Sequence, residues 1–103
     1  MKIFISQPMK GKSVEEIAGE RSNAISQLTE IYGEFEIIEC HFKDIDWDSD
    51  KTPVNEPVKF LSRSINLLAE ADLVVFLSGW HEARGCRIEE SIAHAYGINR
   101  MFL

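Results

Sequence analysis

Residues 79–90, GWHEARGCRIEE, hold three acids, two arginines, a histidine and a cysteine in one short stretch. The stretch lies just after LVVFL, the most apolar run of the chain. Carboxylates in such a place act as nucleophiles or general bases, and arginines bind anions. The function therefore depends on which of these charges is turned toward the interior and which only meets water.

Helical geometry selects one carboxylate from this stretch. Residues placed at about 100° intervals along a helix over 85–96 form one broad apolar arc. The members of the arc are Cys86, Ile88, Ile92, Ala93, Ala95 and Tyr96. The side chains that point away or lie at the border are Arg87, Ser91, His94 and Glu90. Glu89 falls inside the apolar arc, in the first turn of the expected helix, so its carboxylate is aimed at the core.

A carboxylate aimed at the core has two explanations. Burying an unpaired carboxylate is costly, so natural proteins nearly always give it a partner or a function. In the functional interpretation, Glu89 is a nucleophile or a general base in a pocket. In the structural interpretation, it caps the start of the helix or pairs with Arg84 or Arg87. The place of the helix in the fold bears on the choice.

Strand and helix patterns alternate along the whole chain. Short apolar β-type runs predict strands at Lys2–Ser6, 35–39, 73–77 and 98–103. Helical periodicity predicts helices from the capping box of Ser13 and Glu16 to Gly33, from Pro57 to near Asp72, and over 85–96. The economical fold is an α/β, flavodoxin-like open parallel sheet of four to five strands with helices on both faces.

The carboxyl ends of the strands are the expected ligand edge of this fold, at the point where the strand order reverses. The loops after Ile5 and after Leu77 lie at that edge. The first loop, QPMKGKS, lacks the spacing of a Walker loop but joins a strand to the start of a helix, which suits a phosphate or a carboxylate. A solvated turn is the alternative. The residues at this helix start are Lys10, Gly11, Lys12 and Ser13.

The loop after the third strand carries further candidates. Trp80 has the size to stack on a flat ligand ring or to close the core. His81 and Glu82 follow it, and they either line a pocket or meet solvent. Residue type alone leaves these alternatives open.

Length and composition limit the classes of function. The 103 residues, 45% hydrophobic and 27% charged, form one domain over residues 1–103 with a modest core. A formal charge of −6 argues against nucleic-acid polymers and anionic membranes as partners. Because a small domain has few segments that can enclose a ligand pocket, a homodimer or larger homo-oligomer is expected.

Cysteine usage points to a reducing compartment. Cys40 and Cys86 form neither a disulfide framework nor a zinc spacing, and no signal peptide or long apolar span is visible, so a cytoplasmic location is expected. Both thiols are expected to be packing residues.

The acidic segment at 43–57 is expected to be a long surface loop. A calcium loop is not expected in or beside this segment, because the terminal Glu and the central Gly of such a loop are missing; the residues considered are His41, Asp44, Asp46, Asp48 and Asp50.

The stretches KIFISQPMKGKS, LLAEADLVVFL and GWHEARGCRIEESIAHAYG together resemble the nucleoside 2-deoxyribosyltransferase superfamily, which includes the deoxynucleoside 5'-monophosphate N-glycosidases. The resemblance covers nearly the whole chain and is strongest to a branch of small phage and bacterial proteins. The family pattern G-x-G-x-E-x-G carries a glutamate that attacks the anomeric carbon of the sugar. Since GCRIEES places Glu89 at that position, the resemblance and the helical geometry select the same residue.

The resemblance also implies a set of substrate contacts. Phe4 takes the place of an aromatic residue near the base or sugar, and PMKG matches a loop that contacts the phosphate in the monophosphate glycosidases. Contacts from Lys10, Ser13 or Arg84 would favour a nucleotide over a nucleoside. The expected substrate-binding residues are Phe4, Gln7, Pro8, Met9, Lys10, Gly11, Ser78, Gly79, Trp80, Glu82, Arg84 and Gly85.

The sequence departs from the family pattern at three positions. A family aspartate that contacts the leaving group or base falls at Ser64. A second acid, which orients the sugar, falls at Ala83, with Glu82 one residue away as a substitute. The second glycine of the pattern is Arg87, which either blocks close backbone approach or brings a positive charge to a phosphate. Asp72 matches a position that we interpret as structural.

The resemblance implies cleavage or transfer at the N-glycosidic bond of a (deoxy)nucleoside or its 5'-monophosphate. A covalent glutamyl-sugar intermediate would form as in a retaining glycosidase, with no metal or redox cofactor. Family members complete the pocket with a neighbouring subunit. The acids missing at Ser64 and Ala83 instead favour a non-catalytic nucleotide-binding or sequestering module. A third hypothesis, in which Glu89 only pairs with an arginine, predicts no specific ligand.

Overall fold

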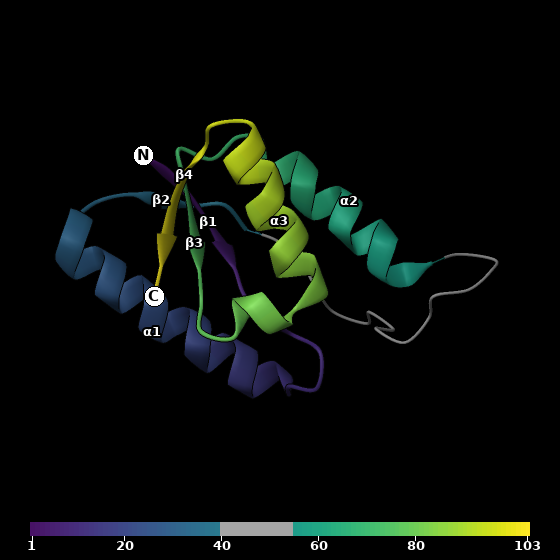
Figure 1. Ribbon diagram of the computed structural model, residues 1–103. Helices are drawn as coiled ribbons and strands as arrows, with labels where there is room; N and C mark the ends of the chain where they lie inside the picture. Colours follow the sequence, from purple (N-terminus) through teal and green to yellow (C-terminus); the bar gives the residue numbers. More distant parts are fainter. Residues whose placement is uncertain (40–54) are drawn as a thin grey trace.

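The computed structural model describes residues 1–39 and 55–103 (Figure 1). The expectations for Cys40, for His41 and for most of the acidic segment at 43–57 lie outside the described residues. The strands are β1 (Lys2–Ser6), β2 (Glu36–Ile37), β3 (Leu73–Phe76) and β4 (Asn99–Phe102). The helices are α1 (Val14–Tyr32), α2 (Glu56–Leu68) and α3 (Arg84–Ala95), with a short 3-10 helix η1 (Trp80–Glu82) between β3 and α3.

The described strands form one parallel sheet in the order β2-β1-β3-β4. Helix α1 covers one face, and α2 and α3 lie side by side on the other (Figure 1). Since the chain builds outward from β1 to β2 and then from β3 to β4, the strand order reverses between β1 and β3. This architecture confirms the predicted α/β flavodoxin-like fold and places the carboxyl ends of β1 and β3 at the point where the strand order reverses, which is where the sequence predicts a ligand.

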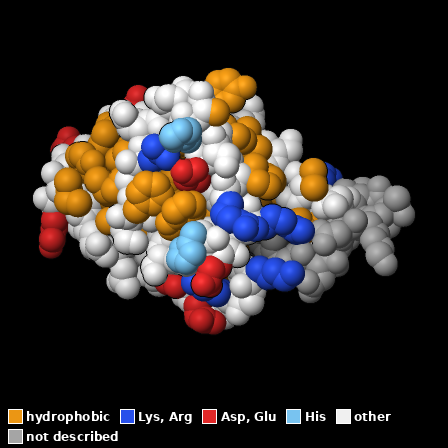
Figure 2. Space-filling model, viewed as in Figure 1, with side chains coloured by type: hydrophobic (Ala, Val, Ile, Leu, Met, Phe, Trp, Pro, Cys, Tyr) orange, Lys and Arg blue, Asp and Glu red, His pale blue; other side chains and the backbone are white. Residues whose placement is uncertain are grey.

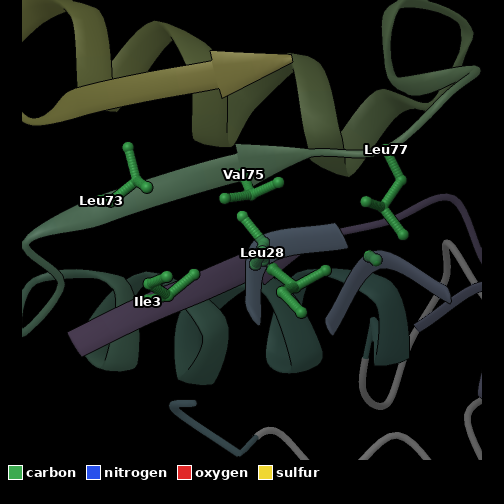
Figure 3. Close-up of a cluster of buried hydrophobic side chains, with 7 residues drawn as sticks. Ile3, Leu28, Leu73, Val75 and Leu77 are labelled. Carbon is green, nitrogen blue, oxygen red and sulfur yellow. The ribbon is translucent and has the colours of Figure 1, made fainter. Parts of the chain in front are cut away.

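The face of the sheet under α1 is apolar. Alternate residues of β1, Ile3 and Ile5, point to this side because successive side chains of a strand point to opposite faces. Figure 3 shows Leu28 of α1 packed among the inward side chains of β1 and β3. The whole cluster consists of Ile3, Ile5, Ala24, Leu28, Leu73, Val75 and Leu77. Leu28 is fully buried, so α1 is anchored through the middle of its apolar stripe.

The opposite face begins in the same way and ends differently. Phe4 packs with Leu68 of α2 and Ala93 of α3, against Val74 and Phe76 of β3. Ser6 is two residues after Phe4, and its side chain reaches α3 on this same face. The carboxyl end of β1 therefore presents a hydroxyl between the two helices.

Capping explains where α1 and α2 begin. At Ser13 and Glu16 the predicted capping box is present, with each side chain accepting a hydrogen bond from the other residue's backbone N–H. Helix α2 begins one residue earlier than expected because the Asn55 side chain caps it by accepting from Val58 N. It ends at Leu68, before the expected end near Asp72.

At two further places, Asp72 agrees with its predicted structural role and β2 departs from its predicted bounds. The Asp72 carboxylate accepts a hydrogen bond of 2.7 Å from the backbone N–H of Lys2, a structural role that ties the start of β3 to the start of β1. Strand β2 spans only two residues rather than 35–39, since it pairs with β1 at two positions and lies at the edge of the sheet.

Helix α3 differs from its prediction in two ways. It begins at Arg84, so Glu89 lies in the second turn and not the first. The buried side is a narrow stripe that holds Cys86, Glu89 and Ala93. Three residues assigned to the apolar arc, Ile88, Ala95 and Tyr96, are exposed, because α3 rests on the sheet and on α2 along one side only. The residues predicted to point outward, Arg87, Ser91 and His94, do so.

Within residues 1–39 and 55–103, no helix has both the length and the apolar character that crossing a membrane requires.

Candidate functional site

Three elements converge on the Glu89 carboxylate. Glu89 projects from α3 and is only 6% exposed. The hydroxyl of Ser6, at the end of β1, donates a hydrogen bond of 2.7 Å to Glu89 Oε1. Ser64 of α2 also hydrogen-bonds the carboxylate through its hydroxyl. The strand end and both helices of this face thus surround one acidic group with neutral donors.

The environment of Glu89 changes its protonation. Burial raises the pKa of the Glu89 carboxyl from 4.5 to about 7, while the hydrogen bonds from Ser6 and Ser64 act to lower it. A carboxyl group with a pKa near 7 is present in both protonation states at neutral pH. It is therefore suited to a nucleophile or a general base, which must exchange between a charged and a neutral or bonded form.

The geometry weighs against the structural interpretation of Glu89. The expected cap is wrong, because Glu89 lies in the second turn of α3 and the start of the helix has no side-chain cap. Arg84 and Arg87 are both exposed, whereas the carboxylate is buried and receives its hydrogen bonds from serines. The buried charge is thus compensated by weak neutral donors.

Cys86 lies one helical turn before Glu89 and is 4% exposed. Burial raises the pKa of its thiol to about 11; a hydrogen bond with Ser6 opposes the rise and the charge of Glu89 adds to it. The thiol is therefore protonated and unreactive at neutral pH. This confirms the expectation that Cys86 is a packing residue.

The loops after β1 and β3 meet beside this site. The backbone N–H of Leu77 donates to the carbonyl of Ser6 at 3.0 Å. Gly79 has a φ of +88°, and a Cβ atom there would lie 3.6 Å from Pro8 Cγ. The two loops expected to hold a ligand are thus packed against each other, and Gly79 permits the turn because its backbone lies in the left-handed region.

Gln7 does not face Glu89. Its side chain is 6% exposed, and its Nε2 donates to the carbonyl of Ile17 in α1 at 3.1 Å. Its Oε1 is buried without a hydrogen-bond partner among residues 1–39 and 55–103. The amide therefore ties the loop to α1, and its predicted contact with substrate stays a prediction.

The proposed anion cradle is partly occupied by the protein's own carboxylates. Glu16 caps the start of α1, and Lys12 pairs with Glu20 at 2.8 Å. Lys10 and Gly11 are exposed, and Gly11 has a φ of +81°. Figure 2 shows Lys and Arg side chains gathered below and to the right of α3, on an otherwise acidic protein. An anion approaching this edge meets favourable charge.

Aromatic residues expected near the substrate lie in the core. Phe4 is 2% exposed within the sheet–helix cluster. Trp80 is half-buried, with its ring centroid 5.5 Å from that of Phe76 and 5.1 Å from that of Phe102. Trp80 thus closes the core between β3 and β4, one of the two alternatives that the sequence left open. Stacking of either aromatic on a ligand stays a prediction.

The remaining candidates lie around the rim of the site. His81 and Glu82, on η1, are exposed and 3.8 Å apart. A Cβ atom at Gly85 would lie 3.9 Å from Leu61 of α2, so this glycine lies where α3 meets α2. Exposed positions are Lys10, Ser78 and Arg84, and half-buried positions are Pro8, Met9 and Gly85.

Two open depressions of the surface lie away from Glu89. One, of about 320 Å³, is lined by Ala93 and His94 of α3 and by residues of the 97–102 segment. The other is lined by Val58, Leu61, Ser62 and Ile65 of α2. Glu89 lines neither of these two depressions.

The two serines that hold Glu89 were missed as site residues from the sequence. The signals were present in the spacing. Ser6 shares a face of β1 with Phe4, and Ser64 lies four residues after Phe60 and four before Leu68, on the buried stripe of α2. Polar residues at inward positions of neighbouring elements predict a buried polar cluster.

Within the described ranges, no three His, Cys, Asp or Glu side chains gather to hold a metal ion.

The fold and the site together define an α/β protein of flavodoxin-like architecture with a buried carboxylate at the reversal of strand order. The chain belongs to the family described as Domain of unknown function (DUF4406), whose model matches residues 1–102. Comparisons with curated proteins and with solved structures gave no match.

Proposed function

We propose that the protein cleaves or transfers at the N-glycosidic bond of a (deoxy)nucleoside or its 5'-monophosphate, with Glu89 as the nucleophile. The observation that carries the proposal is the buried Glu89 carboxylate, held by serine hydroxyls at the carboxyl end of β1. The resemblance of GCRIEES and KIFISQPMKGKS to the nucleoside 2-deoxyribosyltransferase superfamily supports the same residue and the same chemistry.

The reaction follows from the chemistry of an ionised carboxylate beside a sugar. Glu89 attacks C1' as the C1'–N bond breaks, and the departing base takes the bonding electrons and a proton. Water or an acceptor base then attacks C1' from the vacated side and releases the carboxylate, so the configuration is retained. In a site with little water, the negative charge stabilises the oxocarbenium-like transition state strongly.

Positive charge beside the site supports an anionic substrate. Lys10 and Gly11 lie in the loop after β1, and Arg84 begins α3. A 5'-phosphate bound between these segments would place the sugar toward Glu89. A nucleotide is therefore favoured over a nucleoside.

One observation favours a second function, a non-catalytic nucleotide-binding or sequestering module. Ser64 stands where the nucleoside 2-deoxyribosyltransferase superfamily has an aspartate, and its hydroxyl is hydrogen-bonded to Glu89. Position 83 carries the methyl group of an alanine. A protein that binds but does not cleave needs no acid for the leaving group.

Assembly and location stay predictions. Tyr96 is 80% exposed and Ile88 38% exposed on the outer side of α3, which supports contact with a second copy. Sedimentation velocity at micromolar concentration is expected to give a homodimer or larger homo-oligomer, and a monomer with full activity would contradict this. A cytoplasmic location would be tested by fractionation of the native host.

The test compares two adjacent carboxylates. Glu89→Gln removes the buried acid, and Glu90→Gln removes its neighbour, which pairs with Arg100 at 2.8 Å at the surface. Nucleosides and 5'-monophosphates are incubated with each protein, with base release measured by chromatography and binding by calorimetry. We expect Glu89→Gln to reduce base release by about 1000-fold or more, roughly 4 kcal/mol of transition-state stabilisation.

Three outcomes separate the hypotheses. Glu90→Gln is expected to keep its activity within a factor of about three, because an exposed ion pair contributes little. Glu89→Gln with more than roughly a tenth of wild-type activity would exclude Glu89 as the nucleophile. Binding without base release by the wild-type protein would establish the sequestering module instead.

A further inference from the structure

Ser6 and Ser64 have no visible purpose in the apolar packing around them. They are 1% and 2% exposed, on a face whose other inward residues include Phe4, Leu68 and Phe76. Buried hydroxyls are retained where they satisfy another polar group. Here both hydroxyls, from different elements, hydrogen-bond the same carboxylate.

We propose that Ser6 and Ser64 are positioning residues, whose two hydroxyls hold the Glu89 carboxylate in its ionised form and fix its direction toward the sugar. The catalytic half of this statement rests on the proposed function. The positioning itself concerns the protein alone. An ionised carboxylate only accepts hydrogen bonds, so a serine hydroxyl that is bonded to it is the donor.

The arrangement gives Ser64 a role that differs from that of an acid. In its hydrogen bond with the ionised Glu89 carboxylate, Ser64 acts as the donor. Its hydroxyl supports the nucleophile, and the departing base takes its proton from another group or from water. In the nucleoside 2-deoxyribosyltransferase superfamily, which the sequence resembles, an aspartate that contacts the leaving group or base takes this position. Under the proposal, Ser64 instead supports the nucleophile.

Hydrogen bonding and burial act in opposite directions at this site. Burial favours the neutral carboxyl, and donors favour the ion. Among the described residues, the hydrogen-bond partners of the Glu89 carboxylate are the serines of β1 and α2, which do not titrate. On α3 the neighbouring Cys86 keeps its proton, since its pKa is about 11, and Lys12 acts on that thiol from the loop after β1. Among the described residues of this cluster, Glu89 is therefore the group that titrates near pH 7.

The experiment measures the titration of Glu89 directly. The carboxyl carbon is followed by 13C NMR against pH in protein labelled at glutamate, and Glu89→Gln assigns the signal. Ser6→Ala and Ser64→Ala are each compared with the hydroxyl-retaining variants Ser6→Thr and Ser64→Thr. We expect each alanine variant to raise the midpoint by about one pH unit, a tenfold change in the protonation constant, and each threonine variant to stay near wild type.

The pH profile of base release gives the second readout. Each alanine variant is expected to lose about fivefold in kcat near pH 7, to recover most of it near pH 9, and to keep its KM. Folded alanine variants with an unchanged Glu89 midpoint would overturn the proposal, and either serine suffices for this test if the other variant does not fold. Since the NMR titration needs no substrate, a shifted midpoint without any base release would overturn the proposed function and leave the positioning role standing.

Discussion

The two faces of the sheet solve the same packing problem with different residues. Under α1, the inward positions of β1 are Ile3 and Ile5, and α1 adds Leu28. Under α2 and α3, the inward positions of β1 are Phe4 and Ser6, and the helices add Ser64 and Glu89. The polar residues of this second face gather at its carboxyl end, whereas the buried polar residue beside α1 is Gln7, which bonds the Ile17 carbonyl. One face thus stabilises the fold throughout, while the other combines a core with a site.

The difference between the faces indicates that the Glu89 site lowers the free energy of unfolding. A buried carboxylate held by neutral donors is less favourable than a well-packed apolar group. Such residues persist when function requires them, because active sites commonly trade stability for activity. The contrast between the faces therefore makes predictions about stability that need no substrate.

The largest effect is expected on the apolar face. Leu28→Ala removes a fully buried side chain between α1 and the sheet and is expected to cost about 3 kcal/mol of unfolding free energy. The loss is expected to be equal at pH 5 and pH 8, since the α1 cluster has no titrating group. Urea denaturation at both pH values measures it. A loss below about 1 kcal/mol, or one that varies with pH, would break the comparison.

Glu89→Gln is expected to stabilise the protein, but only at higher pH. The folded pKa of Glu89, about 7, lies above its ordinary value of 4.5, so the native state holds this proton more tightly than the unfolded state. The wild-type protein therefore loses stability as pH rises from about 4.5 to 7, by on the order of 3 kcal/mol. Glutamine does not titrate and escapes this loss.

Urea denaturation of the wild type, Glu89→Gln and Glu90→Gln between pH 4.5 and 8.5 tests this sign. The difference in unfolding free energy between Glu89→Gln and the wild type is expected to grow from pH 4.5 to about 7 and to stay nearly constant above pH 7. Glu90→Gln should follow the wild-type curve at a nearly constant offset. Parallel curves for Glu89→Gln and the wild type would mean that the carboxyl titrates normally.

The smallest effect concerns the rim of the site. Lys10→Ala is expected to weaken binding of a 5'-monophosphate about tenfold, roughly 1.4 kcal/mol, and binding of the matching nucleoside much less. The reason is that the positive charge of Lys10, which is exposed after β1, attracts a phosphate more strongly than it attracts an uncharged nucleoside. Calorimetry with both ligands measures the difference. Equal weakening would remove the phosphate from the proposal.

The parts of the fold that were predictable depend on local pattern. Alternation of apolar strands with periodic helices predicts the parallel sheet, and the capping box at Ser13 marks the start of α1. The helical spacing of 86, 89 and 93 predicts that Glu89 faces inward, because the buried stripe of α3 passes through it. These features are fixed by neighbours in sequence.

The rest depends on contacts between distant elements. The approach of Ser6 and Ser64 to Glu89 required knowledge of which strand and helices share a face. The packing of Trp80 on Phe102 joins η1 to the last strand, which a local pattern does not reveal. The breadth of the apolar arc on α3 was overestimated for the same reason, since the area that the sheet and α2 cover is set by tertiary packing.

The most direct test of the central claim is to trap the sugar on Glu89. A deoxynucleoside 5'-monophosphate with fluorine at C2' is incubated with the protein, since the electron-withdrawing fluorine destabilises the oxocarbenium-like transition state and slows release of a glycosyl ester. Intact mass and peptide mass spectrometry then locate any adduct. We predict a sugar-phosphate ester on Glu89 that is absent from Glu89→Gln and present in Glu90→Gln. Base release from this substrate with no adduct, or with an adduct on another residue, would contradict the account.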